Sequence, residues 1–184
     1  MNVIISLLRG VNLGSHHKIK MDALRALYES LKLRDPQTYV QSGNVVFRTG
    51  ERDLVLLARR IEEAIERKFG FRSDVILRSA SELKGVVRRN PFAARRDIEP
   101  GKLLVTFLPR DPGPEMRAEV CRIKAEAEEV RIGDRELYIY YPDGMGRSKL
   151  ARAIEKALKK SGTARNWNTV TKLLEIAERL EASG

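Results

Sequence analysis

The sequence predicts an α+β fold made of two ferredoxin-like halves, each with the element order βαββαβ and one additional helix. Runs of aliphatic and β-branched residues alternate with segments whose apolar residues recur at helical spacing. The order of these segments in the first ninety residues then recurs after a short stretch containing two prolines. We therefore expect each half to form an antiparallel sheet with helices on one face. We find no convincing identity between the halves at the level of residues, so the repeat is one of architecture.

The first half opens with an aliphatic strand and contains one hairpin signal. Two β-rich runs flank Ser42-Gly43, where glycine is free to take a positive φ. Gly70 follows a helical apolar stripe as a C′ glycine, and Ser81 is the expected N-cap of the next helix. The predicted elements are a strand at 2–8, a helix at 21–31, two strands within 38–47, a helix at 54–69, a strand at 73–79 and a helix at 81–89.

The second half repeats this order. Its first helix begins near Pro114 and is expected to bury Met116, Val120, Ile123 and Ala127. A hairpin turns at Gly133-Asp134, and Asn168 or Thr169 is the expected N-cap of the last helix. The predicted elements are a strand at 102–108, a helix from 114, a hairpin within 129–141, a helix at 148–160, a strand within 162–167 and a terminal helix through 180. We place the subdomains at 1–90 and 102–184, with the C-terminal helix in the second and a linker at 91–101.

The chain carries a formal net charge of +10, and the excess lies mostly in the first half. Residues 1–90 contain 17 basic and 10 acidic residues, whereas residues 91–184 contain 18 and 15. One interpretation is attraction to phosphate-bearing partners. The other is solubility, with helix faces that carry Glu–Arg pairs. Because the charges are interspersed, the second interpretation carries more weight for the composition as a whole.

Cysteine content and apolar runs bear on the compartment. Cys121 is the only cysteine, so no internal disulfide is possible, and its position predicts a buried, unreactive thiol. This fits a reducing cytoplasm. No apolar run has the length of a signal peptide or a membrane span. We therefore expect a cytoplasmic protein without a membrane partner.

Five short motifs occur in a fixed order along nearly the whole chain. They are LLRGVN, KIKM, YVQSGNVVF, GRSKL and ARNWNTV. Together they resemble the bacterial family called domain of unknown function 1697. The resemblance implies an α+β protein with ferredoxin-like halves. It implies no activity, because the family has none assigned.

A first cluster of polar residues is predicted from topology. In a βαββαβ unit the end of the first strand and the tip of the following hairpin lie at the same edge of the sheet. Arginine offers a planar fork to a carboxylate or phosphate, and amides both donate and accept. Alternatively, these side chains only stabilise the turn and pair with a helix. The candidate ligand-binding residues are Arg9, Asn12, Gln41, Ser42 and Asn44.

A second cluster follows the same reasoning in the second half. Two glycines precede Ser148 at the start of a helix, where free N–H groups favour anions. The spacing is not that of a Walker motif. We expect the last strand to end beside this loop, so that cations from both segments, with Lys172, surround one anion. The alternative is that Ser148 and Asn168 are ordinary caps. The candidate residues are Arg147, Ser148, Lys149, Arg165, Asn166 and Asn168.

Several chemistries find no support in the sequence. His16 and His17 are adjacent and lack a spaced third ligand, so no metal site is predicted. No cofactor motif is present, and no pair of carboxylates stands out for acid–base catalysis. The predicted central strands lack the aromatic pattern of RNA-binding sheets, although Tyr138 and Tyr140 share a strand face.

The sequence thus favours a cytoplasmic binding protein for an anionic ligand: a nucleotide, a phosphorylated metabolite or single-stranded RNA. One alternative is a metal-independent enzyme acting on a phosphate-bearing substrate, with Lys149 or Ser148 in a catalytic role. Another is an interaction module whose basic faces bind a partner protein. Fold alone does not decide among them. The oligomeric state does not follow from the sequence.

Overall fold

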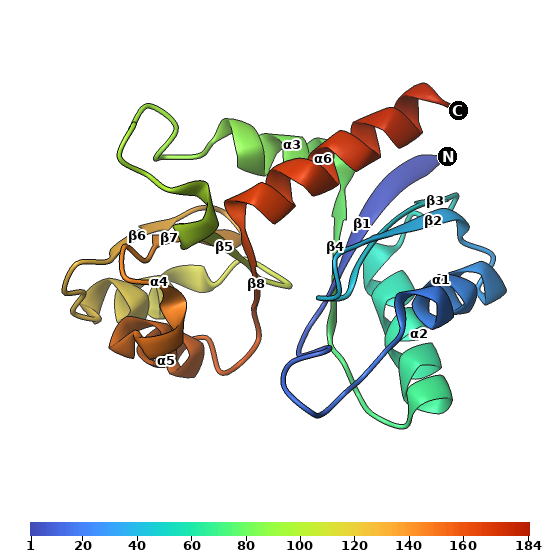
Figure 1. The fold of residues 1–184 in the computed structure, drawn as a ribbon, viewed down its shortest axis with the longest axis horizontal. Helices are drawn as coiled ribbons and strands as arrows, with labels where there is room; N and C mark the ends of the chain where they lie inside the picture. Colours follow the sequence, from blue (N-terminus) through green and yellow to red (C-terminus); the bar gives the residue numbers. More distant parts are fainter. The chain divides into compact units, whose positions relative to one another are not determined.

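The computed structural model describes residues 1–184 and confirms the α+β fold with two four-stranded antiparallel sheets (Figure 1). The chain forms two compact units: residues 1–85 together with 171–184, and residues 86–170. Helices α3 (Ala80–Arg88) and α6 (Trp167–Ala182) each contain a division between units. The C-terminal residues, which the sequence placed in the second subdomain, thus belong to the first unit by their contacts.

The first unit has the predicted βαββαβ order, and its sheet has the strand order β2-β3-β1-β4 that defines a ferredoxin-like fold. All neighbouring strands are antiparallel. The second strand is longer than predicted and contains an irregularity between Arg34 and Gln37. The elements are β1 (Asn2–Leu8), α1 (Met21–Ser30), β2 (Arg34–Tyr39), β3 (Asn44–Thr49), α2 (Leu54–Phe69) and β4 (Val75–Ser79).

Helices α1 and α2 cover one face of this sheet because their apolar stripes match the alternating apolar positions of the strands. Leu24, Ile61 and Ile65 are buried in this core. The one polar contact at its centre joins Ser6 Oγ to Tyr28 Oη at 2.7 Å. Burial raises the pKa of Tyr28 far above its usual value, so the phenol stays neutral.

The end of α6 is tied to the opposite face of the first sheet. Arg48, on β3, pairs with Asp35 and donates hydrogen bonds to the carbonyl of Leu180 and to Ser183 Oγ. A guanidinium at a helix C-terminus satisfies carbonyls that have no partner within the helix. Arg48 therefore fixes the C-terminal end of α6 to the first unit.

The second unit repeats the order, and its sheet runs β6-β7-β5-β8. Helices α4 and α5 bury one face, where Val120, Leu137 and Ile154 meet. No helix in the chain is both long enough and apolar enough to span a membrane. The elements are a 3-10 turn (Pro100–Lys102), β5 (Leu103–Phe107), α4 (Gly113–Arg122), β6 (Glu129–Ile132), β7 (Glu136–Tyr140), a second 3-10 turn (Met145–Arg147), α5 (Lys149–Ala157) and β8 (Thr163–Asn166).

The segment predicted as a linker, 91–101, is attached to the second unit. Phe92 is buried, and the guanidinium carbons of Arg95 and Arg131 lie 5.7 and 5.6 Å from the centre of its ring. Tyr140 Oη donates to the carbonyl of Asp97 at 3.2 Å. Cation–π contacts and this hydrogen bond hold the segment in place, so it is part of the fold.

The two halves share a local signature at the residues that start α3 and α6. Ser79 Oγ accepts from the N–H of Glu82, whose carboxylate accepts from Ser79 N–H, which forms a capping box. Asn166 Oδ1 accepts from the N–H of Thr169 in the same relative position. The predicted caps lie later in the chain and were wrong: Ser81 for α3, and Asn168 or Thr169 for α6.

A buried arginine precedes each of these caps. Arg78 on β4 and Arg165 on β8 are 2% and 7% exposed. Each donates from Nη1 to the carbonyl of the preceding residue, at 2.9 Å in both cases. The repeat therefore extends to single residues: the arginine is identical in both halves, whereas the capping residue differs in type and shares only its role.

Helix α4 ends sooner than predicted. It stops at Arg122, so Ile123 lies just beyond it and Ala127 is exposed rather than buried. Cys121 is also exposed, which corrects the expectation of a buried thiol. Apolar residues continued at helical spacing past the point where the chain leaves the helix, so periodicity alone overestimated its length.

The tight approach of the β2–β3 turn to β1 gives a stability prediction. Gly43 has φ +76°, and a Cβ added there would lie 2.8 Å from Leu8 Cβ. We expect Gly43→Ala to lower the free energy of unfolding by roughly 1–3 kcal/mol in urea denaturation. Gly50→Ala, where a Cβ meets nothing within 4 Å, is the control and should be nearly neutral. Equal effects would show that the close approach is unimportant.

Candidate functional site

Three segments of the first unit meet at one end of its sheet. They follow β1 (residues 9–20), join β2 to β3 (residues 40–43) and precede β4 (residues 70–74). Leu8 N–H donates to the carbonyl of Gly43, and Arg9 N–H donates to the carbonyl of Asp74, both at 2.9 Å. We call these three segments the loop edge.

Asn12 joins two of the three segments. Its Nδ2 donates to the carbonyls of Ile19 at 3.0 Å and Gln41 at 2.7 Å, and its Oδ1 accepts from Ile19 N–H at 2.9 Å. Its own N–H donates to the carbonyl of His17. One side chain thus closes the 9–20 segment on itself and attaches it to the hairpin. This confirms that the end of β1 and the hairpin tip are adjacent, but both amide donors of Asn12 are used inside the protein.

The predicted hairpin residues are of two kinds, those that stabilise the turn and one that faces solvent. Asn44 is fully buried, and its Nδ2 donates to the carbonyl of Tyr39 at 2.9 Å and to Ser42 Oγ at 2.8 Å. Ser42 is partly buried, whereas the Gln41 side chain is exposed. Asn44 and Ser42 therefore build the turn, and of the three predicted hairpin residues only Gln41 presents its amide to solvent.

Arg9 reaches the loop edge on the side of the 70–74 segment. Its guanidinium lies 3.9 Å from the Asp74 carboxylate, and its carbonyl accepts from Ser73 Oγ at 2.8 Å. The five predicted residues of this cluster are thus gathered at one edge, but most of their polar groups are engaged in holding it together. The pairing of Arg9 with Asp74 was not foreseen, although antiparallel β1–β4 pairing places the start of β4 beside the end of β1.

The backbone of the loop edge is unusually constrained. Gly10, Asn12, Gly14 and His17 all have φ between +53° and +68°. Val40 has φ +48°, a conformation that a β-branched residue rarely adopts. Such geometry costs free energy and persists only where surrounding contacts impose it.

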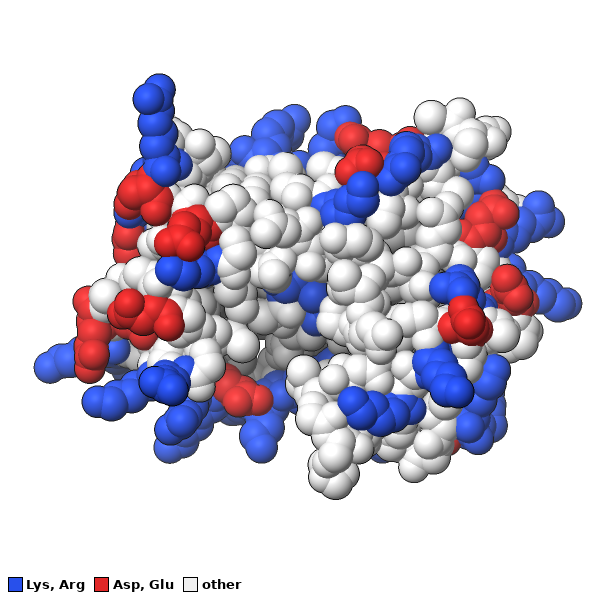
Figure 2. Space-filling view, in the orientation of Figure 1, with Lys and Arg blue, Asp and Glu red and all other residues white.

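Several side chains project from this constrained frame. Lys18 and Lys20 are exposed and form no ion pair, and no acidic residue occurs before Asp22. Leu13 is 69% exposed. Figure 2 shows mostly uncharged surface over the segment between β1 and α1, with basic side chains beside it.

His17 adds an aromatic feature that sequence reasoning missed. Its ring stacks on Phe71 with centroids 4.4 Å apart and planes 12° apart. His17 Nδ1 lies 3.3 Å from the carbonyl of Gly10. The stack of His17 on Phe71 joins the 9–20 and 70–74 segments. No local sequence signal predicts that these two segments meet.

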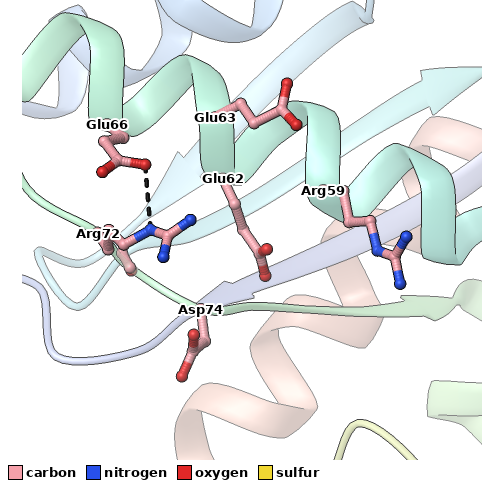
Figure 3. A pocket seen from close by; sticks show the side chains of 7 residues that line it. Arg59, Glu62, Glu63, Glu66, Arg72 and Asp74 are labelled. Atoms are coloured by element: carbon pink, nitrogen blue, oxygen red, sulfur yellow. Dashed lines mark hydrogen bonds and ion pairs between the residues drawn. The ribbon is translucent and has the colours of Figure 1, made fainter.

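An open pocket of about 360 Å³ lies beside the 70–74 segment (Figure 3). Glu62 points from α2 toward the segment that carries Asp74, and Arg72 pairs with Glu66 at 3.1 Å. The pocket carries more negative than positive groups, so it does not suit a phosphate. Its lining residues are Arg59, Glu62, Glu63, Glu66, Arg72, Ser73 and Asp74.

Glu62 differs from the other carboxylates of this pocket. One of its oxygens accepts from the N–H of Val75 at 2.9 Å, which ties α2 to the start of β4. Partial burial, with a smaller contribution from the nearby Asp74 charge, raises the pKa of Glu62 above its usual value, although the Val75 hydrogen bond opposes this. No group of three or more His, Cys, Asp or Glu side chains is arranged to hold a metal ion.

The second predicted cluster is not assembled as expected. Ser148 caps α5 and donates to Glu128 at 2.5 Å, beside the start of β6. Asn166 ends β8, at the opposite edge of the sheet. Three strand spacings of about 4.8 Å, or roughly 14 Å, separate β6 from β8.

The individual residues of that cluster have other surroundings. Arg147 is exposed, and Lys149 lies 3.8 Å from Glu126. Arg165 is buried and donates to Thr163 Oγ1 at 2.8 Å, and burial lowers its pKa to about 10, so it remains charged at neutral pH. Asn168 is exposed on the first turn of α6. Lys172, farther along α6, pairs with Glu175.

Comparisons with known proteins identify a family and a fold. A family model described as "Protein of unknown function (DUF1697)" matches residues 1–138. A conserved bacterial protein from Streptococcus pneumoniae of known structure has a similar fold, with a TM-score of 0.78 and 20% sequence identity. The match covers 96% of this chain and 98% of that one. No match was found among curated proteins.

The role of Asn12 gives a second stability prediction. Asn12→Gly accommodates the positive φ but removes three side-chain hydrogen bonds. We expect it to lower the free energy of unfolding by about 2 kcal/mol and to speed amide exchange in residues 9–20. Ser15→Gly adds a glycine to the same segment and should do neither. Unchanged exchange in Asn12→Gly would contradict the role assigned to this side chain.

Glu62 gives a pH-dependent prediction. A folded-state pKa above the unfolded one means that the native state binds more protons, so this group lowers stability as pH rises from about 4.5 through its raised pKa. Glu62→Gln keeps an acceptor for Val75 N–H and removes the charge. Thermal melts from pH 4 to pH 8 should show the variant gaining stability over the natural protein as pH rises. A difference that is constant with pH would contradict the raised pKa.

Proposed function

The chain belongs to the DUF1697 family of proteins of unknown function, and we propose that it is a binding protein for an anionic ligand at the loop edge of its first unit. The ligand class is that of phosphate-bearing molecules: a nucleotide, a phosphorylated metabolite or single-stranded RNA. The proposed setting is the cytoplasm, which suits a chain with a single exposed thiol.

One observation carries this proposal: residues 9–20 form a rigid segment that contains no acidic residue and presents lysines to solvent. The side-chain hydrogen bonds of Asn12 hold residues 9–20 in place, although several of these residues adopt positive φ angles that cost free energy. A frame fixed before binding loses little conformational entropy when a ligand arrives. Lys18 and Lys20, without carboxylate partners, are then available to phosphate oxygens.

The loop edge supports this function better than the GRSK segment does. Lys149 lies near Glu126, and Ser148 donates its hydroxyl to Glu128, whose pKa is held below its usual value mainly by that hydrogen bond. The carboxylates of Glu126 and Glu128 beside the start of α5 would repel a phosphate bound there. Arg165, which the sequence analysis placed in the same cluster, is buried on β8.

The enzyme alternative finds less support in this geometry. The pocket beside the loop edge contains the one carboxylate there with a raised pKa, Glu62, which is a feature of some acid–base sites. However, Glu63, Glu66 and Asp74 surround it, and a phosphate-bearing substrate would be repelled.

A protein partner is the second candidate. Leu13 and Val40 are 69% and 48% exposed, and they adjoin the two residues that the Asn12–Gln41 hydrogen bond joins. Exposed apolar side chains on a rigid loop are typical of protein contacts. Replacing Leu13 by serine separates the candidates, because it should leave binding of a simple anion unchanged.

Charge removal tests the proposed function. We expect Lys18→Gln with Lys20→Gln to weaken binding of inorganic polyphosphate by about tenfold or more in low-salt calorimetric titration, because charge-assisted contacts are lost. Affinity of the natural protein should also fall as salt rises.

The matched control removes two charges from the second unit that are also exposed. Arg147→Gln with Lys149→Gln should change polyphosphate affinity by less than about threefold, since nearby glutamates already offset one of these charges. An equal loss in both double variants would mean diffuse attraction to a basic surface. Absence of any polyphosphate binding would leave the protein-partner candidate in first place.

A further inference from the structure

We propose that the anion bound at the loop edge is single-stranded RNA, with one base stacked on the His17 ring and the flanking phosphates held by Lys18 and Lys20. This rests on the proposed function and specifies its ligand class. The observation behind it is the stack of the exposed His17 ring on the partly buried Phe71, which a site for phosphate alone would not need.

The stack forms a platform whose orientation is fixed. Phe71 backs one face of the His17 ring at a centroid distance of 4.4 Å, and the Nδ1 contact with the Gly10 carbonyl holds the ring at its edge. His17 is exposed although Phe71 covers one face of its ring, and we infer that the other face accepts the base. Aromatic faces of this kind bind unstacked bases with little sequence preference.

Charges near the platform set the path of a strand. Lys18 and Lys20 lie on the same segment as the platform and have no acidic partner. On the other side, Glu62 and Asp74 face the pocket and would repel phosphates. A strand therefore runs over residues 17–20 and away from the pocket. The exposed amide of Gln41, across the Asn12 bond, is placed to contact a base edge.

The sheet surface that many RNA-binding ferredoxin-like domains use is closed in the second unit at the two tyrosines of β7. Tyr138 and Tyr140 are 2% and 7% exposed, and their hydroxyls donate to the carbonyls of Val86 and Asp97. They cannot stack on bases without unfolding that face. This corrects the possibility that these tyrosines offer a platform, and it places base stacking on a loop.

The test uses the full chain and fluorescence anisotropy. The probes are a labelled adenosine octaribonucleotide, an RNA duplex of the same length and inorganic polyphosphate of similar length as competitor. His17→Asn removes the ring while keeping a residue that tolerates a positive φ. We expect it to weaken octamer binding by about tenfold, a typical loss for one stacked base, and to leave polyphosphate binding unchanged.

Two further variants make the result specific. His17→Tyr retains a stacking ring and should stay within about threefold of the natural protein. His16→Asn changes the neighbouring exposed histidine and should have no effect. Equal losses in His17→Asn and His16→Asn, or a duplex that binds as tightly as the single strand, would overturn the stacking role.

Failure of this inference can be told from failure of the proposed function. If polyphosphate binds and the octamer binds no better, the loop edge is an anion site and the RNA assignment is wrong. If neither binds, both proposals fail. Octamer binding that is lost in His17→Asn while polyphosphate binding persists supports both.

Discussion

The side-chain amide of Asn12 is the interaction on which the loop edge depends. Its three side-chain hydrogen bonds close residues 9–20 and attach them to the hairpin at Gln41. They stabilise a segment in which Gly10, Asn12, Gly14 and His17 are held at positive φ. The motifs LLRGVN and QSGN, far apart in the sequence, therefore meet in the loop edge and stabilise it together. The residues that make them recognisable serve mainly to build the frame, and the residues that face solvent lie between them.

The fold followed from the sequence because each half satisfies several local rules at once. Apolar spacing located α2 residue by residue, and the Ser42-Gly43 pair located the hairpin. Topology alone then predicted that Asn12 lies beside the hairpin tip. Helix starts were less well predicted, because Ser79 and Ser81, or Asn166 and Asn168, are equally good caps by residue type. The choice between them depends on where the preceding strand ends, which pairing with β1 and β5 decides.

Side-chain partners were the part that the sequence did not contain. The predicted cradle around Ser148 required β8 to lie beside the α5 loop, but strand order places it at the far edge. Arg165 looked like a surface cation and is buried. The His17–Phe71 stack and the Arg9–Asp74 pair join segments separated by more than fifty residues, and no local pattern reports them. Antiparallel pairing of β1 with β4 was the one available signal for the second contact.

The central claim is that the loop edge of the first unit binds phosphate-bearing ligands through its pre-formed segment 9–20, which contains no acidic residue. The most direct measurement is an NMR titration of the ¹⁵N-labelled protein with a single-stranded RNA octamer, read as amide shift changes along the chain. We expect the largest changes in residues 9–20 and 40–43, with unchanged signals for residues 145–149. Shift changes centred on 145–149, or spread evenly over basic residues of both units, would contradict the account.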